Sequence, residues 1–174
     1  FNHGFTLEHF GLSTPEQVYR LARLGANVSA NAYYVHELSD IYANLSVGYE
    51  RASSMSRIGS CFRERVTTAL HSDFTMAPAQ PLMSMWVAVN RINEKGDLMS
   101  PEERITPMEG LKAITINAAR ILGLDHEIGS IRAGKKADFT VLSDNPLEID
   151  PMKIKDIEIN ATIFEGKVFK INKS

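Results

Sequence analysis

The sequence predicts an α/β protein in which parallel strands alternate with helices, followed by a small β-rich segment. Strand, helix and strand patterns succeed one another over residues 5–30 with short connections, which is typical of a βαβ unit with parallel strands. A second strand, loop and helix pattern follows over residues 66–89. Beyond Asp125, short β-branched runs separated by turns replace the helical patterns.

The first predicted unit begins with a strand over residues 5–9, where apolar and polar residues alternate before Gly11 interrupts the pattern. A helix start follows at residues 13–17, with a hydroxyl cap, a proline and an acidic residue in the first turn. The apolar face of this helix consists of Val18, Leu21, Ala22 and Leu24. We expect Gly25 to end the helix and residues 26–30 to form the next strand.

The second unit is preceded by residues 31–54, in which hydrophobic periodicity fails and tyrosines accumulate. We interpret this segment as a long irregular loop, and long loops in compact domains are usually functional. A helix is expected over residues 55–65 and a β-branched strand over residues 66–71. A proline-punctuated loop then leads into an apolar helix over residues 82–89.

A capping box predicts the last helix. Thr106 and Glu109 have the required spacing, with Pro107 between them, and the helix is expected to continue to Leu122 and to end at Gly123. The β-rich segment that follows has predicted strands at residues 139–142, 157–159, 162–164 and 167–169.

Composition limits the classes of function. The 174 residues are 44% hydrophobic and 23% charged, an ordinary globular composition, and the net charge of −2 comes from interspersed acidic and basic residues. This argues against nucleic acid and anionic membranes as partners and leaves a small molecule as the default. Cys61 is the only cysteine, which excludes an intrachain disulfide and fits a reducing compartment. With neither a signal peptide nor a long apolar run, the chain is expected to be cytoplasmic.

Three ionisable residues lie where predicted strands end. His9 ends the first strand, and His71 and Asp73 end the third, on one face of it if the strand continues to Asp73. Chemistry in barrels of parallel strands lies at these carboxyl ends, and histidine and carboxylate are ligands expected for zinc. Lone histidines at strand ends are more often structural, so spacing alone is a weak signal.

The chain resembles the amidohydrolase superfamily, in the branch of the YtcJ-like and N-substituted formamide deformylase-like proteins. The resemblance rests on Leu7-Glu8-His9, on the run from Leu70 to Asp73, and on residues 129–138 (GSIRAGKKAD). It implies the C-terminal portion, about strands 6–8, of a TIM-type (β/α)8 barrel over residues 1–125. Residues 126–174 would then be part of a small β-sandwich domain.

The resemblance also implies a divalent metal, zinc above all, and hydrolysis of non-peptide C–N bonds by a metal-activated water. It assigns His9 and Asp73 as metal ligands and Asp73 as the catalytic residue that takes a proton from the attacking water. Tyr33, Tyr34 and Arg51 lie where substrate-facing loops are expected, for a small amide-type substrate. His71 is a further substrate-binding candidate, although a supporting or packing role is equally consistent with the sequence.

The sequence departs from the family's pattern in its ligand set. The family also requires a His-x-His pair and a mid-barrel ligand, and neither motif occurs in these 174 residues. We therefore expect a fragment of a hydrolase that lacks its N-terminal half or a homo-oligomer, with an incomplete and weakly occupied metal site. The alternative is a non-catalytic, self-associating half-barrel remnant.

Overall fold

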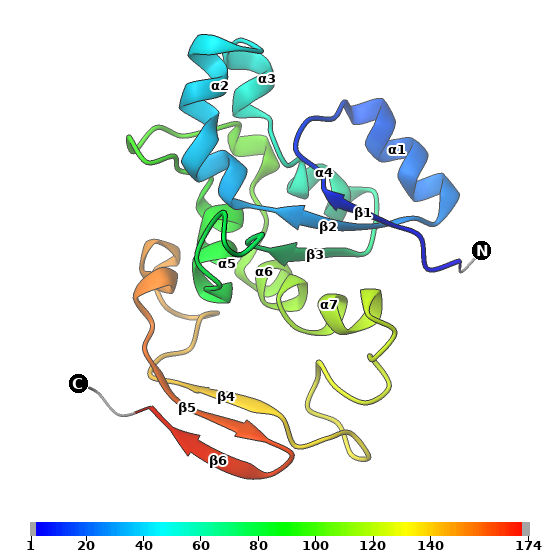
Figure 1. The fold of residues 1–174 in the computed structure, drawn as a ribbon, viewed down its shortest axis with the longest axis vertical. Coiled ribbons are helices and arrows are strands. Elements are labelled where there is room, and N and C mark those ends of the chain that lie inside the picture. Colours follow the sequence, from blue (N-terminus) through cyan, green and yellow to red (C-terminus); the bar gives the residue numbers. More distant parts are fainter. Residues whose placement is uncertain (1–2, 172–174) are drawn as a thin grey trace.

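The computed structural model describes residues 3–171 and contains two three-stranded sheets joined by helices (Figure 1). The strands are β1 (Thr6–His9), β2 (Asn27–Asn31), β3 (Thr68–His71), β4 (Phe139–Leu142), β5 (Ile159–Phe164) and β6 (Lys167–Lys170). The α-helices are α1 (Pro15–Leu24), α2 (Ser39–Leu45), α3 (Tyr49–Ser53), α4 (Ile58–Arg63), α5 (Pro81–Asn90), α6 (Pro107–Ala113) and α7 (Ile116–Ile121). A π-helix spans Tyr34–Leu38, and 3₁₀-helices span Pro101–Glu103 and Pro151–Asp156.

The first sheet is parallel, in the order β1-β2-β3, which confirms the predicted βαβ arrangement. Helix α1 is the crossover between β1 and β2. It begins where the sequence predicts, because the Thr14 side chain accepts the Gln17 backbone N–H and the Gln17 side chain accepts that of Thr14. Gly25 ends the helix with a left-handed φ of 69°.

The main hydrophobic core lies between this sheet and the helices. Val28 and Ala30 of β2 are fully buried and belong to one cluster with Val18 of α1 and Ile58 of α4. Burying a side chain of this size stabilises the fold by about 1.5–3 kcal/mol. Helix α5 is buried on nearly all sides, as expected for a helix with apolar residues around its whole circumference.

The segment between β2 and α4 differs from the prediction. Residues 31–54 are mainly helical rather than irregular, with the π-helix running directly into α2 and a short turn leading to α3. The individual helices are only five to seven residues long. The π-helix has a longer period than an α-helix, and α2 and α3 are each too short to show a clear 3.6-residue period, which explains the absence of a helical signal in the sequence.

The predicted helix over residues 107–122 is also interrupted. It consists of α6 and α7, separated at Ile114 and Thr115. Thr115 has φ −128° and ψ −96°, outside helical values, and its hydroxyl donates to the Leu111 carbonyl at 2.6 Å. A threonine side chain that bonds one turn back often bends a helix. The capping box of Thr106 and Glu109 at the start of α6 is confirmed.

The second sheet is antiparallel, in the order β4-β5-β6. The run expected at residues 162–164 belongs to β5, which begins at Ile159, whereas residues 157–158 of the other expected run precede the strand. Several large apolar side chains of this sheet and its flanks are exposed, including Phe164, Val168, Phe169 and Ile171. The 3₁₀-helix Pro151–Asp156 joins the sheet to the core by packing against α5.

None of the helices among the described residues has the length and apolar character needed to cross a membrane.

Candidate metal centre

The candidate metal ligands lie at the carboxyl edge of the parallel sheet. His9 is the last residue of β1, and Asp73 follows the end of β3 by two residues. The Nδ1 atom of His9 lies 3.9 Å from Oδ2 of Asp73, and the two side chains are 49% and 45% exposed. The structure brings together two side chains that are 64 positions apart in the sequence, and it leaves both accessible to a ligand.

Regular strand geometry alone would not direct His9 toward β3. His9 is in register with Ala30, whereas His71 is in register with Asn31, so strand alternation would send the two histidines to opposite faces. His9 instead has φ 67°, in the left-handed region that non-glycine residues seldom adopt. Its ring centroid lies 5.1 Å from that of His71. The left-handed backbone therefore turns the His9 side chain toward β3.

Asp73 is reached by a turn rather than by a continued strand. Strand β3 ends at His71, as predicted, so the condition that it continues to Asp73 is not met, and Asp73 has φ 51°. The Asp73 backbone N–H donates to Nδ1 of His71 at 3.1 Å instead of extending the sheet. The carboxylate thereby leaves the strand direction and faces His9.

The His71 ring is held in one tautomer. Because Nδ1 accepts the Asp73 N–H, the ring proton lies on Nε2, which is buried. Burial, followed by the charge of His9, lowers the pKa of His71 below its ordinary value. His71 is therefore a neutral imidazole at neutral pH.

Of the other predicted site residues, Tyr34 lies nearest this pair. Its ring centroid is 6.3 Å from that of His9, and a side chain at Gly11 would meet the Tyr34 ring at 3.3 Å. Burial raises the pKa of Tyr34, and the charge of Asp73 raises it further. Tyr34 is thus packed against the turn that follows His9.

Tyr33 and Arg51 have different environments. Tyr33 is 1% exposed, its hydroxyl is buried without a hydrogen-bond partner in residues 3–171, and burial raises its pKa. Arg51 lies on the exposed surface of α3. Their assignment to substrate binding stays a prediction.

Asn31 is a residue near the site that the sequence analysis did not single out. It is fully buried at the end of β2, accepts the Tyr33 N–H at 3.0 Å and donates to the sulfur of Met76 at 3.7 Å. The predicted strand ends at residue 30, so the position of Asn31 at the end of β2, in the same sheet as His9 and His71, follows only from the structure.

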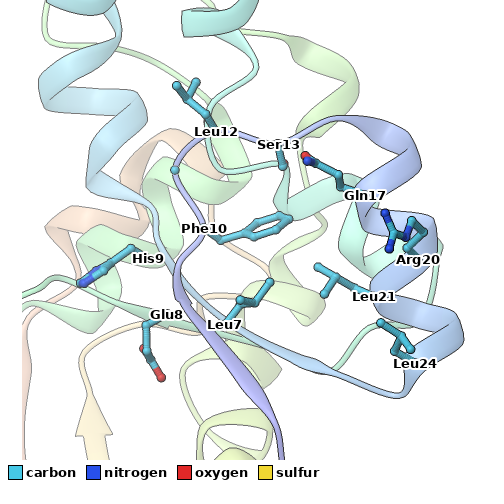
Figure 2. A pocket seen from close by; sticks show the side chains of 11 residues that line it. Leu7, Glu8, His9, Phe10, Leu12, Ser13, Gln17, Arg20, Leu21 and Leu24 are labelled. Atoms are coloured by element: carbon cyan, nitrogen blue, oxygen red, sulfur yellow. The ribbon is translucent and has the colours of Figure 1, made fainter.

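A cavity of about 440 Å³ lies between β1 and α1, beside His9 (Figure 2). Figure 2 shows Phe10 and Leu7 pointing toward α1 and His9 pointing away from it. Asp73 and Tyr34 do not line this cavity. His9 therefore lines this cavity at the edge of β1, whereas Asp73 does not.

Among residues 3–171, no group of three or more histidine, cysteine, aspartate or glutamate side chains is arranged to hold a metal ion. The pair of His9 and Asp73 thus stands as two potential ligands. Atoms bound to one zinc ion at about 2.0–2.2 Å lie within roughly 4 Å of one another, so the pair's spacing is compatible with a shared ion.

The family of the chain is shown by its sequence. The model of the amidohydrolase family matches residues 1–169. The chain belongs to the amidohydrolase family.

Three curated relatives illustrate the match. This amidohydrolase chain is 28% identical over 160 residues to N-substituted formamide deformylase of Arthrobacter pascens, covering 92% of the chain and 30% of the relative. It is 37% identical over 143 residues to Protein LONG AFTER FAR-RED 3 of Arabidopsis thaliana, covering 81% and 24%. It is 27% identical over 166 residues to the putative amidohydrolase YtcJ of Bacillus subtilis, covering 93% and 31%. The chain thus spans 24–31% of the length of these relatives.

Solved structures share the fold. An uncharacterized metal-dependent hydrolase from Pyrococcus horikoshii superposes with a TM-score of 0.70 and 22% identity, covering 85% of this chain and 31% of that one. An adenosine deaminase from Xanthomonas campestris with bound zinc gives a TM-score of 0.68 and 20% identity, covering 94% and 36%. At these identities the similarity establishes the α/β fold alone.

The glycine and lysine motif of this amidohydrolase is a structural turn. Gly129 has φ 83°, and a Cβ there would lie 2.6 Å from Cβ of Ala119, so no side chain fits between the motif and α7. Lys135 donates to the Asp125 and Ile128 carbonyls and to the Ser130 hydroxyl. The motif therefore fixes the chain path from α7 to β4 and lies outside the pair of His9 and Asp73.

Proposed function

We propose that this chain contributes His9 and Asp73 to a divalent-metal site, zinc above all, in a hydrolase of non-peptide C–N bonds. The carrying observation is the 3.9 Å separation between Nδ1 of His9 and Oδ2 of Asp73. Histidine and carboxylate are the donor types that catalytic zinc sites use. The left-handed backbone at both residues supports the proposal, because strained non-glycine conformations cluster at functional sites.

The donor set fits a catalytic metal as a partial site. A zinc ion bound there would lower the pKa of its water and supply a nucleophile near neutral pH. His9, with one ring nitrogen 3.9 Å from the carboxylate, would act as a neutral ligand. Asp73 has two carboxylate oxygens, so one can bind metal while the other takes the proton of the attacking water. Asp73 would then return that proton to the leaving nitrogen.

We also propose that the parallel sheet corresponds to about strands 6–8 of a TIM-type (β/α)8 barrel. Among residues 3–171, strand β1 pairs on one side only, with β2, and Leu7, Phe10 and Leu21 line a cavity between β1 and α1. A further strand at the other side of β1 would satisfy its unpaired backbone groups. On this view the remaining metal ligands come from additional βα units, supplied by a longer gene product or by a second chain.

The second sheet is proposed to be part of a β-sandwich. Its apolar side chains Phe164 and Phe169 are exposed on the same face of an antiparallel sheet of three strands, because Phe169 is in register with Thr162, two residues from Phe164. Sandwiches bury one face of each sheet against the other, and here that second layer is missing from the described residues. The same additional chain would supply it.

The substrate class proposed is a small amide-type molecule. Among the predicted substrate-binding residues, Tyr34 has the position that favours this role most. Its ring lies beside that of His9, and the charge of Asp73 contributes to raising its pKa. A cytoplasmic location is proposed on the single thiol of Cys61, which is fully buried.

Zinc binding to the purified chain tests the proposal. We expect weak, substoichiometric binding in a chelator competition assay, because only two side-chain ligands are present. Asp73→Ala and His9→Ala should each abolish it, whereas Asp144→Ala, in the turn after β4, should leave it unchanged. Zinc binding that survives both site substitutions would contradict the assignment. If the parent chain bound no zinc, the alternative of a non-catalytic, self-associating remnant would be favoured, and sedimentation velocity would then test self-association.

A further inference from the structure

The turn that carries Asp73 is attached to the last side chain of β3. The His71 imidazole accepts the Asp73 backbone N–H through Nδ1 at 3.1 Å. In an Asx-turn, the side-chain oxygen of asparagine or aspartate accepts the backbone N–H two residues on. Nδ1 of histidine is attached to Cγ, as Oδ1 of asparagine is, so His71 makes the equivalent turn with a ring nitrogen.

We propose that His71 is a positioning residue that presets Asp73 for the metal site, a role that rests on the proposed function. It acts through the Asp73 backbone and not by contact with metal or substrate. From the sequence, substrate binding and a supporting or packing role were equally open for His71, and the geometry favours the supporting role.

The turn needs such support because its backbone is strained. Asp73 has φ 51°, in the left-handed region that is unfavourable for a non-glycine residue, although aspartate adopts it more readily than most residues. The Met76 N–H donates to the Asp73 carbonyl at 2.6 Å and closes the turn from the other end. The Asn31 amide holds Met76 by its sulfur at 3.7 Å. Asn31 and His71 are in-register neighbours on β2 and β3, so the sheet supports both ends of the turn.

The His71 ring is itself fixed in place. It is partly buried, and its centroid lies 5.1 Å from that of His9 at an interplanar angle of 55°. One ring therefore contacts the His9 side chain and anchors the Asp73 backbone. The 3.9 Å distance between the His9 and Asp73 side chains follows from this arrangement.

Two substitutions separate this role from simple packing. His71→Leu replaces the imidazole with an apolar side chain of similar size and so removes the Nδ1 acceptor. His71→Asn removes the ring and retains an acceptor on the atom attached to Cγ. His126→Leu is the control, since His126 is exposed and distant in sequence from the site. Thermal unfolding of all three confirms that they fold before other measurements are compared.

The first measurement needs no metal. Hydrogen exchange of the Asp73 amide, followed by NMR, should accelerate by roughly tenfold or more in His71→Leu, since a lost hydrogen bond removes local protection. It should stay within about threefold of the parent in His71→Asn and in the control. An unchanged rate in His71→Leu, or equal acceleration in both His71 variants, would overturn the proposal.

The second measurement is the affinity for zinc alone. Residues that orient metal ligands typically contribute about 10–100-fold to affinity, so His71→Leu should weaken binding by at least tenfold and His71→Asn should largely restore it. Accelerated exchange with unchanged zinc affinity would also overturn the positioning role. If the parent bound no zinc, the proposed metal site would fail in this chain, whereas the exchange rates would still decide whether His71 sets the turn.

Discussion

The indole N–H of Trp86 donates to the Met152 carbonyl at 2.8 Å, which ties the buried helix α5 to the 3₁₀-helix between β4 and β5 of the second sheet. The Lys155 ammonium, on the 3₁₀-helix, lies 4.5 Å from the centroid of the Trp86 ring. The Asn90 amide of α5 donates to the Pro151 carbonyl at 3.0 Å. The two predicted domains therefore share an interface centred on one aromatic side chain.

Trp86→Phe tests this interface. Phenylalanine keeps an aromatic ring and loses the N–H, so the Met152 carbonyl loses its donor and the unfolding free energy should fall by about 1–3 kcal/mol. Urea denaturation measures the change. Asn90→Ala is a useful companion, since it removes the other hydrogen bond between α5 and this segment. No loss in either variant would show that apolar burial alone holds the segment.

Arg91 is the largest fully buried side chain, and its guanidinium bonds four backbone carbonyls. These belong to Ser53, Met55, Ser56 and Met99, at 2.8–3.0 Å. Burial lowers the pKa of Arg91 to about 10, so the group remains charged at neutral pH. Arg91 therefore holds the segment between α3 and α4 against the loop that follows α5.

Arg91→Lys should destabilise the protein by at least about 3 kcal/mol, because one ammonium cannot reach all four carbonyls and each unsatisfied buried group costs about 1–3 kcal/mol. Urea denaturation gives the value. Arg132→Lys, at an exposed position, is the matched control and should change stability by less than about 0.5 kcal/mol. A similar small effect at both positions would refute the role assigned to Arg91.

Local signals in the sequence predicted the elements that depend on neighbouring residues. The cap of α1 at Thr14, its end at Gly25 and the capping box at Thr106 were all confirmed. Their interactions span at most a few residues, so the local sequence is sufficient to predict them. The family, too, followed from short motifs, since each preserves a few residues in fixed order.

Features that depend on distant residues could not be predicted in the same way. The approach of His9 to Asp73 requires two left-handed backbone conformations and a side-chain acceptor on β3. No residue pattern in the sequence predicts these features. The network of Arg91 likewise depends on four carbonyls that come together only in the folded chain. Whether His9 and Asp73 bind metal stays a prediction.

Gly59 and Gly110 allow a comparison between rigid and adjustable packing. A Cβ at Gly59 would lie 2.8 Å from the backbone of Glu103, whereas a Cβ at Gly110 would lie 2.8 Å from Cγ of Met85. Backbone cannot rotate away, so Gly59→Ala should cost about 1–3 kcal/mol more than Gly110→Ala. In a Met85→Ala background the cost of Gly110→Ala should fall, leaving only the contact with Val89 Cγ2 at 3.3 Å, as a double-mutant cycle by urea denaturation would show. Equal costs at the two glycines would contradict this explanation.

The buried thiol of Cys61 makes stability depend on alkaline pH. Burial raises the pKa of Cys61 from 9.0 to about 12. Below pH 9 both the folded and unfolded states keep the proton, so the thiol has no effect on the pH dependence. Between about pH 9 and 12 the unfolded state releases the proton while the folded state retains it, so stability falls by up to about 1.4 kcal/mol per pH unit.

Cys61→Ala isolates this contribution, because tyrosine and lysine titrate equally in both proteins. The parent chain should lose more unfolding free energy than the variant between about pH 8.5 and about pH 10.5, a range that covers the pKa of the unfolded thiol. Urea denaturation under reducing conditions measures the loss. Parallel pH profiles would mean that Cys61 ionises in the folded state, which requires water to reach a side chain that is fully buried. Slow reaction with a thiol reagent in native buffer and rapid reaction in urea would give independent support, since only the unfolded state exposes the thiolate.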